Sequence, residues 1–172
     1  MKAFWIINLA LFQLSWFVAA KYTDYAAWII AAAIFIHFAC SPSKQDDLKL
    51  VMLVPIGIAI DQLMLSVGVF SAASYSVFPL WLALLWYMFI LTLNHSLKWL
   101  TQLPLSYVAV IGAIAGSFTY WLGTQVGGLT QQWPLLPFVA ILAVAWSALM
   151  PVLVGCHRML ITAVKPVPVN HI

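Results

Sequence analysis

Six apolar stretches, separated by short polar breaks, run through the chain at residues 3–20, 22–40, 48–70, 77–97, 104–122 and 134–156. Each is close to the roughly 20 residues that an α-helix needs to cross the hydrocarbon core of a bilayer. The breaks contain turn-forming residues and are too short for anything but antiparallel connections. The pattern predicts an all-α membrane protein, a compact bundle of six transmembrane helices. We expect one domain over residues 1–160 and a short flexible tail over 161–172.

Composition supports this class and narrows the chemistry. The 172 residues are 65% hydrophobic and 6% charged, whereas about 25% of residues are charged in soluble domains. There is no Glu, and the four Asp residues are scattered, which disfavours paired-carboxylate catalysis. The net charge of +3 comes from dispersed basic residues that form no phosphate-binding patch, so nucleic acid is not an expected partner.

Topology follows from the basic residues in the short loops, which stay preferentially on the cytoplasmic side. In a six-helix arrangement one side carries Lys2, Lys44, Lys49, Lys98, Arg158 and Lys165, and the other carries Lys21. Both termini are therefore expected to be cytoplasmic. The first stretch resembles a secretory signal, but Asn8, Gln13 and Ser15 interrupt it at helical spacing, which favours a retained helix.

The stretch at residues 79–100 is long enough to cross a bilayer but carries polar residues near its end. Its last third carries Thr92, Asn94, His95 and Ser96, which stay in hydrocarbon only where they find partners. The helix directions predict two polar layers, a cytoplasmic-side one and a deeper one. The cytoplasmic-side layer contains Asn8, His37, Asn94, His95 and His157. Gln13 and Asp61 lie deeper, where they could hydrogen-bond each other. The predicted polar binding site comprises Asn8, Gln13, Asp61, Thr92, Asn94 and His95.

Catalytic and metal sites are weakly indicated. A metal site from His37, His95 and His157 would require three helices to converge, and no i, i+4 histidine pair supports it, so we expect no metal and no cofactor. His95 and Ser96 are adjacent on a helix and point about 100° apart, which disfavours nucleophilic catalysis. No catalytic motif is recognisable, no catalytic residue is assigned, and a non-enzymatic role is favoured.

Small residues mark the fifth stretch, where Ala109, Gly112, Gly116, Thr119 and Gly123 recur at steps of three and four. Such seams bring helices close together in membranes. We interpret Gly112, Gly116 and Gly123 as helix-packing positions within one chain. Self-association and a substrate groove remain alternatives, and the oligomeric state is open.

Motifs in several stretches resemble a family of small bacterial inner-membrane proteins of unknown function, domain of unknown function 2878. They are Asn8 with Phe12-Gln13 and Trp16, an Asp in the third stretch, Pro79-Leu-Trp81, Leu85-Trp86, Thr92-Leu-Asn-His-Ser-Leu97 with Trp99, and Gly112, Gly116, Tyr120, Gly123 and Gly127. The resemblance implies a multi-pass protein of the bacterial inner membrane, without an established activity. Association of the family with genes for cyclopropane-fatty-acid-synthase-like enzymes implies a part in modifying membrane lipid.

Three functions follow as hypotheses. The leading one is an accessory or binding protein in membrane-lipid (fatty-acid) modification, with membrane lipid and a lipid-modifying enzyme as partners. The second is a small solute or ion carrier that uses Asp61. The third is a membrane-embedded enzyme that acts on acyl chains through His95.

Overall fold

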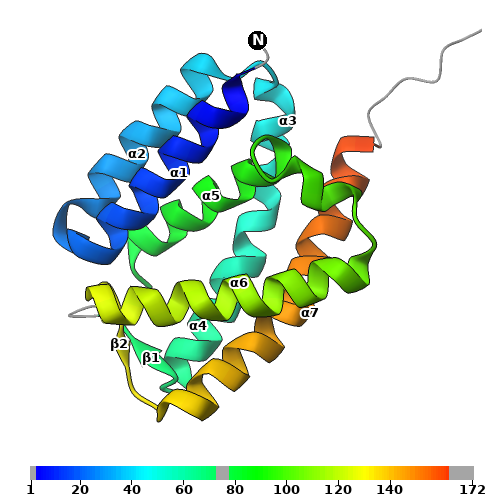
Figure 1. Cartoon of the computed structure of the whole chain (residues 1–172). Coiled ribbons are helices and arrows are strands. Elements are labelled where there is room, and N and C mark those ends of the chain that lie inside the picture. Colours follow the sequence, from blue (N-terminus) through cyan, green and yellow to red (C-terminus); the bar gives the residue numbers. More distant parts are fainter. Residues whose placement is uncertain (1–2, 73–77, 163–172) are drawn as a thin grey trace, which may run out of the picture.

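The computed structural model describes residues 3–72 and 78–162 and is predominantly helical (Figure 1). Its elements in chain order are α1 (Phe4–Lys21), α2 (Thr23–Cys40), α3 (Lys44–Lys49), the 3₁₀ helix η1 (Leu50–Leu53), α4 (Val54–Ser66), β1 (Phe70–Ser71), α5 (Leu80–Asn94), the 3₁₀ helix η2 (Lys98–Gln102), α6 (Leu105–Val126), β2 (Thr130–Gln131) and α7 (Leu135–Thr162). Most of the expected tail, residues 163–172, lies outside the described residues.

Five helical segments are long and apolar enough to cross a membrane. They are α1, α2, the continuous segment Lys44–Ser66, α6 and α7. The expected fourth span is shorter than predicted, because α5 has 15 residues and a helix of that length extends only about 22 Å. His95 leaves the helical conformation with φ −128° and ψ −89°. The lengths and composition of these helices indicate a multi-pass membrane protein.

The helical segment that contains the third apolar stretch begins at Lys44, before the predicted start at residue 48, and it includes a 3₁₀ helix between two α-helices. α3 contains the charged run before the apolar residues, and η1 then leads into α4, which has Pro55 in its first turn. Proline lacks an N–H, and the first turn of a helix is where that loss costs least. Asp47, which the sequence pattern assigns to a loop, therefore lies on a helix and is fully buried.

Two short strands were not predicted. β1 and β2 pair antiparallel with Phe70 opposite Gln131, and thereby tie the segment after α4 to the segment after α6. Gly68 and Gly127 precede these strands with φ of +69° and +114°, a left-handed conformation that glycine adopts without steric cost. Two residues per strand are too few to leave a recognisable alternating pattern.

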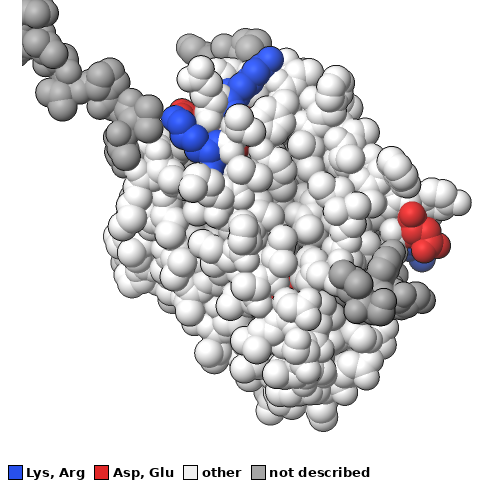
Figure 2. All heavy atoms as spheres, turned by 180° about the vertical axis from the view of Figure 1, so that it is seen from behind, with Lys and Arg blue, Asp and Glu red and all other residues white. Residues whose placement is uncertain are grey.

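The helices pack into two groups that meet at α4 and α5. α1 and α2 form an antiparallel hairpin against α5, while α6 packs along α7, with α4 between α5 and α7 (Figure 1). Large apolar side chains such as Trp28, Phe35 and Leu136 are at least three-quarters exposed on the outside. In Figure 2 the visible Lys and Arg atoms gather mainly in one patch at the top of the view, and most of the face is uncharged. Such a surface suits a hydrocarbon surrounding.

Candidate functional site

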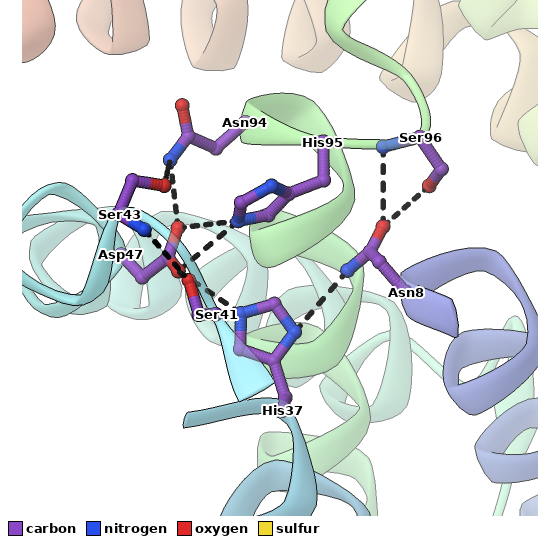
Figure 3. Close-up of polar contacts among 8 residues, drawn as sticks. All are labelled: Asn8, His37, Ser41, Ser43, Asp47, Asn94, His95 and Ser96. Atoms are coloured by element: carbon purple, nitrogen blue, oxygen red, sulfur yellow. Dashed lines mark hydrogen bonds and ion pairs between the residues drawn. The ribbon is translucent and has the colours of Figure 1, made fainter. Parts of the chain in front are cut away.

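A buried carboxylate is the centre of the largest polar cluster in the described structure (Figure 3). Asp47 Oδ1 accepts hydrogen bonds from Asn94 Nδ2 at 2.7 Å and from His95 Nε2 at 2.8 Å. Its Oδ2 accepts from His37 Nε2 at 3.1 Å and from the Ser41 hydroxyl. We call Asn8, His37, Ser41, Ser43, Asp47, Asn94, His95 and Ser96 the Asp47 cluster.

Three helix ends bring these groups together. His37 lies in the last turn of α2, Ser41 directly follows that helix, and Asp47 lies on α3. Asn94 and His95 close the C-terminal end of α5, and Asn94 Nδ2 also donates to Ser43 Oγ at 3.2 Å. Helix ends leave backbone groups without helical partners, so polar side chains gather there readily.

Asn8 of α1 connects the cluster to the first helix and determines a proton position. Its Oδ1 accepts from the Ser96 backbone N–H at 3.2 Å and from the Ser96 hydroxyl. Because Oδ1 faces these donors, the Nδ2 group faces His37 Nδ1, at 3.4 Å, and donates to it. In this orientation His37 accepts at Nδ1 and donates from Nε2 to Asp47.

Apolar packing covers the two imidazoles. The Phe4 ring meets the His37 ring at a centroid distance of 5.2 Å and the His95 ring at 4.7 Å, edge-on in both cases. His37 is fully buried and the His95 side chain is 7% exposed. In such surroundings hydrogen bonds are stronger than in water and an unpaired polar group is costly. The cluster therefore centres on one buried carboxylate and two largely buried imidazoles, groups able to hold a proton or a divalent metal.

The predicted site residues fall into different places. Asn8, Asn94 and His95 belong to the Asp47 cluster. Thr92 does not, because its hydroxyl donates to the Phe89 carbonyl at 2.5 Å. His157 is buried, and among the described residues neither of its ring nitrogens has a hydrogen-bond partner.

The site predicted from the sequence does not include Asp47. Hydropathy assigned it to the polar break at residues 41–47, although the sequence contains a signal for a helix start there. Ser43 is followed three residues later by Asp46, a spacing typical of helix N-termini. That spacing predicts α3 and hence places Asp47 on a helix, although no side-chain capping bond from Ser43 is present.

Asp61 occupies a second polar position, deep in the bundle. Trp86 Nε1 of α5 donates to Oδ2 at 2.6 Å, and the Tyr120 hydroxyl of α6 donates to Oδ1 at 2.5 Å. The Trp86 ring also stacks on Trp146 of α7 at a centroid distance of 5.5 Å. The hydrogen bonds of Asp61 thus come from aromatic side chains rather than from Gln13, which is exposed.

An apolar cavity of about 460 Å³ lies between α1, α5 and α6, with Trp146 and Met150 of α7 also contributing to its wall. Its volume is within the range of about 300–1,000 Å³ that is typical of small-molecule pockets. Gln13 lines this cavity, as do both donors to Asp61, Trp86 and Tyr120. The cavity is therefore separate from the Asp47 cluster and adjoins the Asp61 position.

The glycines of α6 differ in what they contact. A Cβ on Gly112 would lie 2.6 Å from Met150 Cγ, and one on Gly116 would overlap the Trp146 ring. A Cβ on Gly123 would have its nearest neighbour, Leu129 Cδ1, at 4.0 Å. Gly112 and Gly116 thus permit the close approach of α6 and α7, whereas Gly123 leaves room for a methyl group.

Comparisons with known proteins identify a family but no characterised relative. No curated protein and no solved structure matches the chain. The family model described as "Protein of unknown function (DUF2878)" matches residues 5–152, which include the whole Asp47 cluster, Asp61 and Tyr120. The resemblance noted from the sequence motifs is confirmed, and the chain belongs to this uncharacterised family.

Proposed function

We propose that this protein binds a membrane lipid of the bacterial inner membrane and that the cavity between α1, α5 and α6 holds one acyl chain. The observation that carries the proposal is the apolar cavity of about 460 Å³ in a chain whose helices suit a membrane. A flexible hydrocarbon chain in such an apolar cavity makes dispersion contacts with the surrounding rings.

The rim and walls of the cavity support an acyl ligand. Trp99 and Phe118 line it and are about half exposed, so the cavity is reached from the apolar surface of the bundle. Trp81 also lines it and is 4% exposed. Within the described part of the chain, the Trp81 indole N–H has no hydrogen-bond partner. A buried donor without a partner is costly, and an ester or carboxyl oxygen of a lipid would satisfy it.

The orientation we propose has both termini in the cytoplasm. Lys44, Lys49, Lys98 and Arg158 lie on α3, η2 and the last part of α7, and Lys21 ends α1. By the preference of basic residues for the cytoplasmic side, the Asp47 cluster then faces the inner leaflet. We propose that this side docks a lipid-modifying enzyme, for which the protein acts as an accessory in fatty-acid modification.

A carrier based on Asp61 is less well supported. Its side chain is 2% exposed, and both carboxylate oxygens accept hydrogen bonds from the surrounding aromatic residues. A transported cation would have to displace Trp86 or Tyr120 from these bonds. We therefore prefer lipid binding to transport.

Filling the cavity tests the proposal. Ala115 lines the cavity, whereas its neighbour Ile114 is 67% exposed and does not line it. Protein purified in mild detergent is incubated with a photoactivatable fatty-acyl phospholipid, and crosslinked lipid is measured by mass spectrometry. We expect crosslinks at α1, α5 and α6 in the native protein and in Ile114→Trp, with loss of most of them in Ala115→Trp.

Two outcomes contradict the proposal. One is equal crosslinking in Ala115→Trp and Ile114→Trp, when both variants remain monodisperse. The other is labelling spread evenly over the outer surface of all helices. The accessory role is tested separately by lipid mass spectrometry of a deletion strain, where an unchanged fatty-acid profile contradicts the role in modification.

A further inference from the structure

We propose that His37, Asp47 and His95 form a binding site for a divalent transition metal ion. One ligand atom from each residue, the two imidazole nitrogens and a carboxylate oxygen, lies within 4.8 Å of the others. Two imidazoles and one carboxylate are a ligand set that suits zinc and other first-row metals. The site is independent of the cavity and of lipid binding.

The distances are close to those of a coordination sphere. Ligand atoms that lie about 2.0–2.2 Å from a tetrahedral zinc ion are about 3.3–3.6 Å from one another. In the structure, His37 Nε2 is 3.1 Å from Asp47 Oδ2, and His95 Nε2 is 2.8 and 3.0 Å from the two carboxylate oxygens. Each imidazole nitrogen needs to move only a few tenths of an ångström from the carboxylate to reach this spacing, and the two imidazole nitrogens lie within 4.8 Å of each other.

The outer partners also suit a metal site, because ligating carboxylates and imidazoles are themselves held by hydrogen bonds. Ser41 and Asn94 donate to the carboxylate of Asp47. Asn8 contacts the second ring nitrogen of His37. Three protein ligands would leave a coordination position for water or another small ligand.

Charge supplies a further argument. Within the described part of the chain, the partners of the fully buried Asp47 that can carry a positive charge are His37 and His95, while Lys49 pairs with Asp46 instead. A buried carboxylate is costly without a positive charge nearby, and a bound dication would supply that charge.

One contact opposes the metal-bound form and makes the inference sharply testable. A metal on His37 Nε2 requires the proton on Nδ1, where the Nδ2 group of Asn8 now points. Reversing the Asn8 amide would restore a hydrogen bond to His37 but would lose the one from the Ser96 backbone N–H. A carboxylate at position 8 accepts both bonds. Asn8→Asp is therefore expected to tighten metal binding, by about tenfold.

Metal binding is measured on the full chain in detergent or nanodiscs. After removal of metal with a chelator, the protein is titrated with Zn²⁺, and bound zinc is determined by elemental mass spectrometry after gel filtration. Co²⁺ is added in parallel, because its visible spectrum reports coordination by nitrogen and oxygen ligands. The ligand variants are His37→Gln, His95→Gln and Asp47→Asn, and the matched controls are His157→Gln and Asp46→Asn.

The expected result is one Zn²⁺ per chain in the native protein and in both controls. Each ligand variant should lose more than the roughly 10- to 100-fold in affinity that loss of an outer partner costs. The inference is overturned if the native protein binds no stoichiometric Zn²⁺ or Co²⁺, or if zinc binding is equal in the folded histidine variants and in His157→Gln. Either histidine variant alone can test the site. The experiment therefore remains decisive if Asp47→Asn does not fold.

Discussion

The two buried aspartates of this protein, Asp47 and Asp61, have the same side chain in contrasting surroundings. Asp47 lies at the ends of helices and receives four side-chain donors, two of them imidazoles. Asp61 lies deep among the helices and receives two donors, both aromatic. The first is held by groups that are able to bind a proton or a metal, whereas the second fastens α4 to α5 and α6.

The difference shows that burial of a carboxylate does not by itself indicate a functional site. What distinguishes the two is the identity of the donors. Indole and phenol groups donate a hydrogen bond and complete the packing of apolar rings. Imidazoles can in addition hold a proton or bind a metal. The Asp47 cluster is therefore the better candidate for chemistry, and the Asp61 position the better candidate for stability of the cavity wall.

Removing the carboxylate of Asp47 should have the largest effect on stability. Asp47→Ala leaves the donors of His37, Asn94 and His95 buried without their acceptor, and loss of one partner of a buried ionic network costs about 3–5 kcal/mol. We expect this fall in the free energy of unfolding in mixed-micelle denaturation. The control is Asp46→Ala, which loses only a partly exposed pair with Lys49 and should change stability by less than about 1 kcal/mol. An equal loss of stability in Asp47→Ala and Asp46→Ala would contradict the prediction that the buried Asp47 cluster stabilises the fold.

A methyl group added to α6 at Gly116 should disturb the stacked rings of Trp86 and Trp146 without affecting the Asp47 cluster. Gly116→Ala places a Cβ against the Trp146 ring and should cost about 1–3 kcal/mol through overpacking. Gly123→Ala has space and should be neutral or stabilising, because alanine favours helices over glycine by about 1 kcal/mol.

The measurement is the thermal unfolding midpoint together with tryptophan fluorescence, since Trp146 stacks on Trp86. Zinc binding should be unchanged in both glycine variants. A loss of zinc binding in Gly116→Ala would show that the two regions are coupled rather than separate.

Replacing Asp61 with a neutral side chain should destabilise the protein less than Asp47→Ala or Gly116→Ala. Asp61→Asn keeps the side-chain volume and one acceptor oxygen, and the Tyr120 hydroxyl can rotate to accept a hydrogen bond instead of donating one. We expect a loss of about 1 kcal/mol, the contribution of one hydrogen bond. Flux of protons and monovalent cations in proteoliposomes should equal that of the native protein. A fall in flux with intact folding would instead favour the carrier hypothesis.

The sequence predicted most helices well because hydropathy is additive along a segment. α1, α2, α6 and α7 each begin one residue after their predicted starts. It predicted α5 poorly, because the apolar run continues past Asn94 while the backbone turns at His95. The predicted cytoplasmic-side polar layer contained Asn8, His37, Asn94 and His95 of the Asp47 cluster. It also contained His157, which lies outside the cluster, and it lacked Asp47, which hydropathy treats as loop.

By itself, then, the sequence determined that the chain is an apolar helical protein suited to a membrane, and its motifs indicated the family. Periodicity and hydropathy are local properties, so they report which residues form helices and how deep each lies. Which groups meet depends on distances between helix ends that are far apart in the chain, such as the 2.8 Å between His95 and Asp47. The tertiary structure alone decided that Asp47 joins two histidines while Asp61 joins two aromatic residues.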